Sequence, residues 1–110
     1  DQFGAQIFDV IRRARPQPKR EGMQITGEVV YIDQFGNCIT NIAENLVTGD
    51  CEIVVNQHTI HGVQSSYSTV KPGKPLAIFA GHGNLEIAVR NGNASKSLNI
   101  DRRDKIIIQL

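Results

Sequence analysis

Residues 31–42, YIDQFGNCITNI, place polar side chains where a plain β-hairpin would alternate apolar ones. Gly36 can adopt a positive φ without a Cβ clash and Asn37 tolerates a similar conformation, so one interpretation is a turn between two strands. The other is a binding loop at a barrel rim, in which Asp33 accepts from an ammonium group, Asn37 pairs with an adenine edge and Phe35 offers a flat apolar surface. The polar and glycine positions are Asp33, Gly36, Asn37, Thr40 and Asn41.

A glycine-rich segment at residues 79–94, FAGHGNLEIAVRNGNA, could also contact a ligand. Gly81 and Gly83 flank His82 and leave backbone N–H groups accessible. The segment contains neither GxxxxGK[ST] nor GxGxxG, so it is weak evidence for a phosphate loop. A lone histidine in such a turn is more often exposed than catalytic. Glu86 could be a buried acid with a partner, but alternation favours a structural residue at the rim.

The remaining reactive side chains predict no metal centre and no catalytic group. His58 and His61 are three residues apart, which on a strand sends them to opposite faces and argues against a shared zinc site. Cys38 and Cys51 have no metal-ligand spacing and are expected to be reduced, small hydrophobic residues. Tyr67 precedes the KPGKP turn and is either a plug over the barrel end or a stacking platform.

Short strands must position these residues. From Met23 onward, apolar side chains alternate with a period of two in segments bounded by Gly, Asn, Asp or Pro, which is typical of an all-β barrel or sandwich. The absence of long amphipathic helices between them argues against a parallel α/β sheet. The strand segments are QITGEVVYID, IVVNQHTIHGV, PLAIFA, NLEIAV and DKIIIQL, and helical turns are expected in NIAENL and NASKSL.

The first part of the chain has a different pattern. Residues 3–14 carry apolar side chains at helical spacing, and a proline-rich segment ends the pattern. Residues 15–22, RPQPKREG, look like a linker between domains. We therefore expect residues 1–22 to be the tail of an upstream domain plus a linker, and residues 23–110 to form one barrel domain.

Composition limits the classes of partner. The 110 residues are 40% hydrophobic, enough for the core of one domain. A net charge of +1 lacks the basic excess of a protein that binds nucleic acid or anionic membranes. No apolar run approaches the roughly 18 residues that cross a bilayer. We expect a soluble, cytoplasmic domain with neither nucleic acid nor membrane as a partner.

Two blocks together resemble the C-terminal domain of the S-adenosyl-L-methionine hydroxide adenosyltransferase family. They are GEVVYIDQFGNCITNI and SSYSTVKPGKPLAIFAGHGNLEIAVRNGNA, with D-x-F-G-N-x-x-T-N and G-x-L-E-I-A-V in the family's order. The superfamily also includes S-adenosylmethionine-dependent chlorinases and fluorinases. The resemblance covers residues 15–110 and implies a closed Greek-key β-barrel. Residues 1–14 would be the tail of the family's larger N-terminal α/β domain.

The resemblance implies an activity for a longer protein. S-adenosylmethionine would bind between the N-terminal domain of one subunit and the barrel of its neighbour in a homotrimer. Water or hydroxide would attack C5′ and release adenosine and L-methionine without a cofactor. The family's water-activating residues lie in the N-terminal domain, so the 110-residue chain alone is expected to be inactive. Hydroxide is favoured over a halide because hydrolytic members are the common ones.

The resemblance also implies roles for individual residues. Asp33 would hold the methionine ammonium group, Asn37 the adenine edge, and Phe35 would pack beside the nucleoside. Tyr67 matches the aromatic position that stacks on adenine. The full substrate-binding set is Asp33, Phe35, Asn37, Tyr67, Gly81, His82, Val89, Arg90 and Asn91.

The second block departs from the family in part. Gly81 and His82 stand where the family contacts the methionine end, yet many relatives have Ser at the first position and the halogenating members have Arg at the second. The backbone of residues 89–91 would meet the base.

The sequence is also compatible with two other functions. One is a stand-alone barrel that binds a nucleotide or oligonucleotide, although the near-neutral charge and 5% aromatic content weigh against stacking several bases. The other is an oligomerisation module without a ligand.

Overall fold

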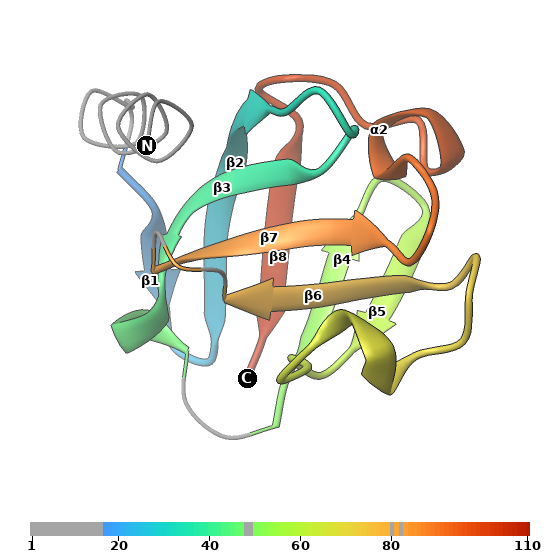
Figure 1. Ribbon diagram of the computed structural model, residues 1–110. Helices are drawn as coiled ribbons and strands as arrows, with labels where there is room; N and C mark the ends of the chain where they lie inside the picture. Colours follow the sequence, from blue (N-terminus) through green and yellow to red (C-terminus); the bar gives the residue numbers. More distant parts are fainter. Residues whose placement is uncertain (1–16, 48–49, 80, 82) are drawn as a thin grey trace.

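The computed structural model describes residues 17–47, 50–79, 81 and 83–110 (Figure 1). The helix predicted over residues 3–14 lies outside these residues. Within them, nearly all regular structure is β-strand, as predicted. The strands are β1 (Lys19–Glu21), β2 (Gln24–Ile32), β3 (Cys38–Ala43), β4 (Glu52–Val55), β5 (His58–His61), β6 (Pro75–Phe79), β7 (Asn84–Val89) and β8 (Lys105–Gln109). The short helix α2 covers Ala94–Ser97, and two 3₁₀ turns, η1 and η2, cover Glu44–Leu46 and Tyr67–Thr69.

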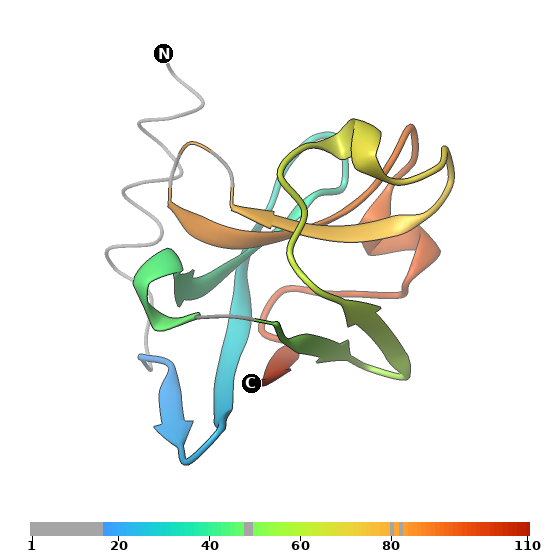
Figure 2. The ribbon, with the colours of Figure 1, turned by 90° about the horizontal axis from the view of Figure 1, so that it is seen from below.

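The strands form one antiparallel sheet that curls into a nearly closed barrel. Its order is β5-β4-β8-β2-β3-β7-β6, and β1 pairs with β2 at one side. The two ends of this order meet where Gln64 forms a parallel bridge with Ile78, and the Gln64 N–H donates to the Ala77 carbonyl at 2.8 Å. In Figures 1 and 2, β3, β7 and β6 lie across β2, β8 and β4, so that the two halves enclose a common interior. The all-β barrel prediction is confirmed.

Period-two alternation explains how the barrel is filled. In β8 the fully buried Ile106 and Ile108 alternate with residues that are exposed or only partly buried. They pack in one core cluster with Val29 of β2 and Ile53 of β4. Removing each such side chain from water contributes about 1.5–3 kcal/mol, so the interior is the main source of stability.

β7 departs from this alternation because both of its faces are covered. All six of its residues are buried. Leu85 and Ile87 face the barrel core, whereas Ala88 belongs to a second cluster with Leu76, Ile78 and the partly buried Val70. The loop that carries η2 and Val70 therefore covers the outer face of β7, an arrangement that positions the site described below.

Three local predictions differ from the structure. Part of the expected linker, Lys19–Glu21, is a strand paired with β2. The run IVVNQHTIHGV is a hairpin of two strands, because Asn56 adopts a φ of +53° that turns the chain. In NIAENL only residues 44–46 are helical, since the preceding residues belong to β3. No helix in the described part of the chain is long and apolar enough to cross a membrane.

Candidate functional site

A cavity of about 540 Å³ opens at one end of the barrel. Its size falls within the roughly 300–1,000 Å³ of typical small-molecule sites. Three segments that are distant in sequence meet there: the DQFGN loop between β2 and β3, the η2 turn, and the turn after β7. The described lining residues are Phe35, Asn37, Tyr67, Ser68, Val89, Arg90, Asn91 and Gly92.

The cavity brings together most of the residues named from the sequence. Six of its lining residues belong to the predicted set: Phe35, Asn37, Tyr67, Val89, Arg90 and Asn91. Ser68 and Gly92 were not predicted. Their only sequence signal is that each adjoins a predicted residue in a turn.

Asp33 is the first residue of the DQFGN loop and organises it. The side chain is buried, and its Oδ1 accepts the backbone N–H groups of Phe35 and Asn37, both at 2.9 Å. Its Oδ2 accepts from the Asn37 amide nitrogen at 3.1 Å. Asp33 is not among the described residues that line the cavity. Its hydrogen bonds fit the turn interpretation directly, and contact with an ammonium group stays a prediction.

Gly36 lets this loop pack against α2. Its φ is +83°, and a Cβ at this position would lie 1.9 Å from the Oδ1 of Asn93. The Gly36 carbonyl accepts the Ser95 N–H at 3.0 Å, which ties the loop to the start of α2. Asn93 caps the same helix by accepting the Lys96 N–H at 2.9 Å. The loop is therefore fixed from outside as well as by Asp33.

Asn37 is held with a defined amide orientation. A carboxylate only accepts hydrogen bonds, so the group that faces Asp33 must be the Asn37 NH₂. This leaves the Asn37 carbonyl oxygen as an acceptor beside the cavity. Phe35, in the same loop, exposes 63% of its surface although it is a large apolar residue. Its ring is therefore available to contact a ligand in the cavity.

Tyr67 is anchored through its hydroxyl group. The hydroxyl donates to the Oε2 of Glu86 at 2.6 Å, although the side chain remains 40% exposed at the cavity. Burial of the phenol, this hydrogen bond and the negative charge of Glu86 raise the Tyr67 pKa above its ordinary value. The phenol therefore stays protonated and remains a donor at neutral pH.

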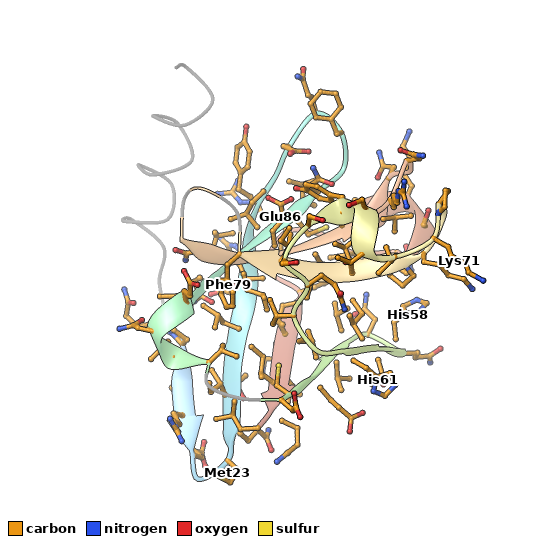
Figure 3. All side chains as sticks on the ribbon, turned by 60° about the horizontal axis from the view of Figure 1, so that its bottom comes forward. Met23, His58, His61, Lys71, Phe79 and Glu86 are labelled. Atoms are coloured by element: carbon orange, nitrogen blue, oxygen red, sulfur yellow. The ribbon has the colours of Figure 1, made fainter. Side chains whose placement is uncertain are left out.

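Glu86 is buried and accepts from Tyr67, so the favoured expectation of a rim residue is wrong and the alternative, a buried acid with a partner, is confirmed. It lies on the outer face of β7, where the alternation of side chains predicts partial exposure. The η2 loop covers this face and brings Tyr67 above the carboxylate; Figure 3 labels Glu86 beside that turn. Sequence alternation gives no sign of a covering loop, because the loop reaches β7 only through tertiary packing.

Arg90 turns its guanidinium group toward the backbone of the η2 loop. Its Nη1 donates to the Val70 carbonyl at 2.6 Å and to the Ser68 carbonyl at 3.4 Å. Its own backbone is paired with Gly73 and Lys74, at 2.7 and 3.0 Å. Arg90 lines the cavity while its charged group is used to hold the loop.

Asn91 adopts a φ of +57° in the tight turn after β7. The turn is closed by the Gly92 N–H, which donates to the Val89 carbonyl at 3.0 Å. Within the described residues, the Asn91 backbone makes no hydrogen bond to another backbone group. Its N–H and C=O are thus polar groups that a ligand could use.

The two residues predicted for the methionine end are not brought into this cavity by the described part of the chain. Gly81 is exposed and is absent from the described lining residues. His82 lies outside the described residues. Their assignment to the methionine end stays a prediction.

The other polar groups of the opening segment serve the barrel itself. Thr40 Oγ1 accepts the Ile42 N–H at 3.1 Å, and Asn41 Oδ1 accepts the Glu28 N–H at 2.9 Å. Both cysteines are free and buried. Burial, followed by the charges of Asp33 and Glu86, raises the Cys38 thiol pKa to about 12, so this thiol is unreactive at neutral pH.

The histidines lie on a different part of the barrel. His61 Nδ1 is 3.3 Å from Glu52 Oε2, and both side chains are largely exposed. His58 and His61 are labelled in Figure 3, away from Glu86. No group of three or more His, Cys, Asp or Glu side chains among the described residues is arranged to hold a metal ion.

Comparison with known proteins adds three relatives. The chain is 34% identical over 74 residues to the (R)-S-adenosyl-L-methionine hydrolase of Thermus thermophilus, an alignment that covers 67% of this chain and 28% of that protein. The crystal structure of an uncharacterised conserved protein from Thermotoga maritima matches with a TM-score of 0.76 and 30% identity, over 88% of this chain and 40% of that one.

The crystal structure of a conserved hypothetical protein from Thermus thermophilus matches with a TM-score of 0.69 and 29% identity, over 84% of this chain and 37% of that one. The chain thus spans well under half the length of each of these relatives. Residues 27–107 match the model of the SAM hydroxide adenosyltransferase C-terminal domain, a span that includes every described lining residue of the cavity. The chain therefore belongs to the family of SAM hydroxide adenosyltransferase C-terminal domains.

Proposed function

We propose that this barrel binds the adenosine part of S-adenosyl-L-methionine within a longer enzyme that hydrolyses it to adenosine and L-methionine. One observation carries the proposal: six residues named from sequence for this substrate line a single cavity in the described structure. The kinship with a protein named (R)-S-adenosyl-L-methionine hydrolase supports the reaction class. The nucleophile is proposed to be water, and the enzyme to act as a homotrimer in the cytoplasm.

The cavity offers groups that suit a purine nucleoside. The exposed rings of Phe35 and Tyr67 provide apolar faces, and a base stacked on an aromatic ring gains roughly 1–3 kcal/mol. The Asn37 carbonyl oxygen would accept from the exocyclic amino group of adenine, because its amide nitrogen is turned to Asp33. The Asn91 backbone provides a second donor and acceptor in the lining.

The chemistry assigned to this domain is positioning. Methionine leaves from a sulfonium centre, which is already a good leaving group, so alignment and partial desolvation of the attacking water account for much of the catalysis. The two buried carboxylates near the cavity are engaged, Asp33 by the DQFGN loop and Glu86 by Tyr67. We therefore assign no general base to the described residues.

Calorimetric titration with adenosine tests the binding role. We expect Phe35→Ala to weaken adenosine binding about 5- to 150-fold through the loss of stacking. Asn37→Ala should raise KM for S-adenosylmethionine in the longer enzyme by the equivalent of about 1–3 kcal/mol. Met23→Ala and Gln57→Ala are matched controls, because both residues are exposed and do not line the cavity.

The outcomes separate the candidate functions. Unchanged adenosine affinity in both Phe35→Ala and Asn37→Ala, with the fold intact, would remove this cavity from the proposal. Binding of oligonucleotides with a steep salt dependence would instead indicate a nucleic-acid barrel. The reaction is tested by release of adenosine and methionine from S-adenosylmethionine by the longer enzyme.

A further inference from the structure

The placement of Tyr67 requires an explanation, because its own turn does not fix it. η2 is three residues long, has no side-chain cap and contains no buried residue. Its two backbone hydrogen bonds, from Thr69 to Ser66 and from Val70 to Tyr67, are both 3.4 Å long. Such lengths lie beyond the usual range of roughly 2.7–3.2 Å for N–H···O bonds and indicate weak bonds. The turn also has side-chain bonds of its own, from Thr69 Oγ1 to the Ser66 carbonyl at 2.7 Å and between the Ser66 and Ser68 hydroxyls at 2.9 Å, but they do not involve the Tyr67 ring.

Two groups from the β7 segment hold this turn at separate points. The Glu86 carboxylate accepts the Tyr67 hydroxyl at 2.6 Å, and the Arg90 guanidinium donates to the Val70 carbonyl at 2.6 Å. Both bonds are much shorter than the two backbone bonds of η2. A hydrogen bond to an ionised group is roughly twice as strong as one between neutral groups. These two contacts therefore join the turn, and with it the Tyr67 ring, to the β7 segment.

The β7 segment is a rigid base for these contacts. β7 is paired with β3 on one side and β6 on the other, and all of its residues are buried. Glu86 and Arg90 are four residues apart, and an even spacing along a strand places side chains on the same face. Arg90 continues the pairing beyond β7 through its backbone bonds to Gly73 and Lys74.

We propose that Glu86 and Arg90 are positioning residues that hold the Tyr67 ring against the cavity in the orientation that receives a purine. The hydrogen bonds from Tyr67 to Glu86 and from Arg90 to the Val70 carbonyl are called the clamp below. The role of the ring as a purine platform rests on the proposed function, whereas the clamp does not. Glu86 acts through Tyr67 and does not touch the ligand. The Tyr67 hydroxyl is used by Glu86, which leaves the ring itself to contact the ligand.

Removal of the clamp should loosen the ring without removing it. We expect Glu86→Leu and Tyr67→Phe each to weaken adenosine binding about three- to tenfold, because the ligand must then order a free ring. The double variant should be no weaker than either single one, since both changes break the same contact. Glu86→Gln retains an acceptor for the hydroxyl and should bind adenosine nearly as the unaltered chain does.

Arg90 is tested by replacing its head group while keeping the aliphatic stem. Arg90→Met should reduce adenosine affinity by a similar factor, because the Val70 carbonyl loses its donor. Phe35→Ala combined with Glu86→Leu should give multiplied losses, since Phe35 belongs to another segment. Losses of Glu86→Leu and Tyr67→Phe that multiply would overturn the clamp, as they would mean that Glu86 acts independently of Tyr67.

A spectroscopic measurement separates the clamp from the proposed function. The chain contains only two tyrosines, so Tyr67→Phe assigns the Tyr67 ring signals in NMR spectra of ¹³C-tyrosine-labelled protein. Glu86→Leu should move the Tyr67 Cζ signal, and Glu86→Gln should move it less. An unmoved signal with an intact fold would overturn the proposal. If the unaltered chain bound no adenosine, the proposed function would fail, and the Tyr67 signal would decide the clamp.

Discussion

Replacement of Asp33 tests how the DQFGN loop is built. The carboxylate is 6% exposed and accepts two backbone N–H groups and one side-chain amide, all from within the loop. Asp33→Ala removes all three acceptors. Asp33→Asn keeps one oxygen for the two N–H groups and replaces the other with an NH₂ that faces the NH₂ of Asn37.

The structure sets different magnitudes for the two changes. An unsatisfied buried donor costs about 1–3 kcal/mol, and both N–H groups are part-buried, so Asp33→Ala should lower the free energy of unfolding by about 2–5 kcal/mol. Asp33→Asn loses only the side-chain contact and should cost about 1–2 kcal/mol. For a domain of this size, each kcal/mol corresponds to a fall in Tm of about 4–8 °C.

Urea denaturation followed by circular dichroism measures both losses. Asp50→Ala is the matched control, because Asp50 is an exposed carboxylate and should change stability by less than about 0.5 kcal/mol. Asp33→Ala should also weaken adenosine binding, since Phe35 and Asn37 lose their support. A loss of stability no larger than that of Asp50→Ala would refute the view that Asp33 organises the loop.

The ammonium role predicted for Asp33 gives a different pattern. In the longer enzyme, Asp33→Asn would then weaken methionine and S-adenosylmethionine binding while leaving adenosine binding nearly intact, a loss of about 2–5 kcal/mol. Separate titrations with methionine and adenosine distinguish the two roles. Equal losses for both ligands would leave only the loop-organising role.

Two further predictions concern the DQFGN loop and the residue that follows it. Gly36→Ala should destabilise the fold by more than about 2 kcal/mol, because the new Cβ would collide with Asn93. Gly62→Ala is the control: Gly62 has a similar φ but nothing within 4 Å of the added Cβ, so this change should cost only about 1 kcal/mol. Equal losses of stability in urea denaturation would contradict the collision. The Cys38 pKa rises from 9.0 to about 12 on folding, so its stabilisation is complete below about pH 9 and is lost as pH rises toward 12. Between about pH 8 and pH 10 the unaltered chain should lose about 1.4 kcal/mol relative to Cys38→Ala, and parallel stability curves would show that the thiol does not titrate in this way.

Much of the framework was predictable from the sequence because its signals are local. Alternation predicts a strand in DKIIIQL, and the structure forms β8 there with Ile106 and Ile108 buried. The glycine of DQFGN indicated a turn that needs a positive φ, which Gly36 adopts. The cavity residues were named through the resemblance of whole blocks to a family; composition and spacing alone left both a turn and a binding loop open.

The roles of individual polar groups depended on the folded chain. Tyr67 meets Glu86 across 19 residues of sequence, and Arg90 reaches Val70 across 20. No periodic pattern encodes such pairs, because they form only when the η2 loop covers the outer face of β7. The sequence therefore specified strands and turns through alternation and backbone preference. The Asn37 amide is oriented locally, by Asp33 four residues earlier. The burial of Glu86 and the anchoring of Tyr67 arose from long-range packing, which determines the neighbours of these two polar groups.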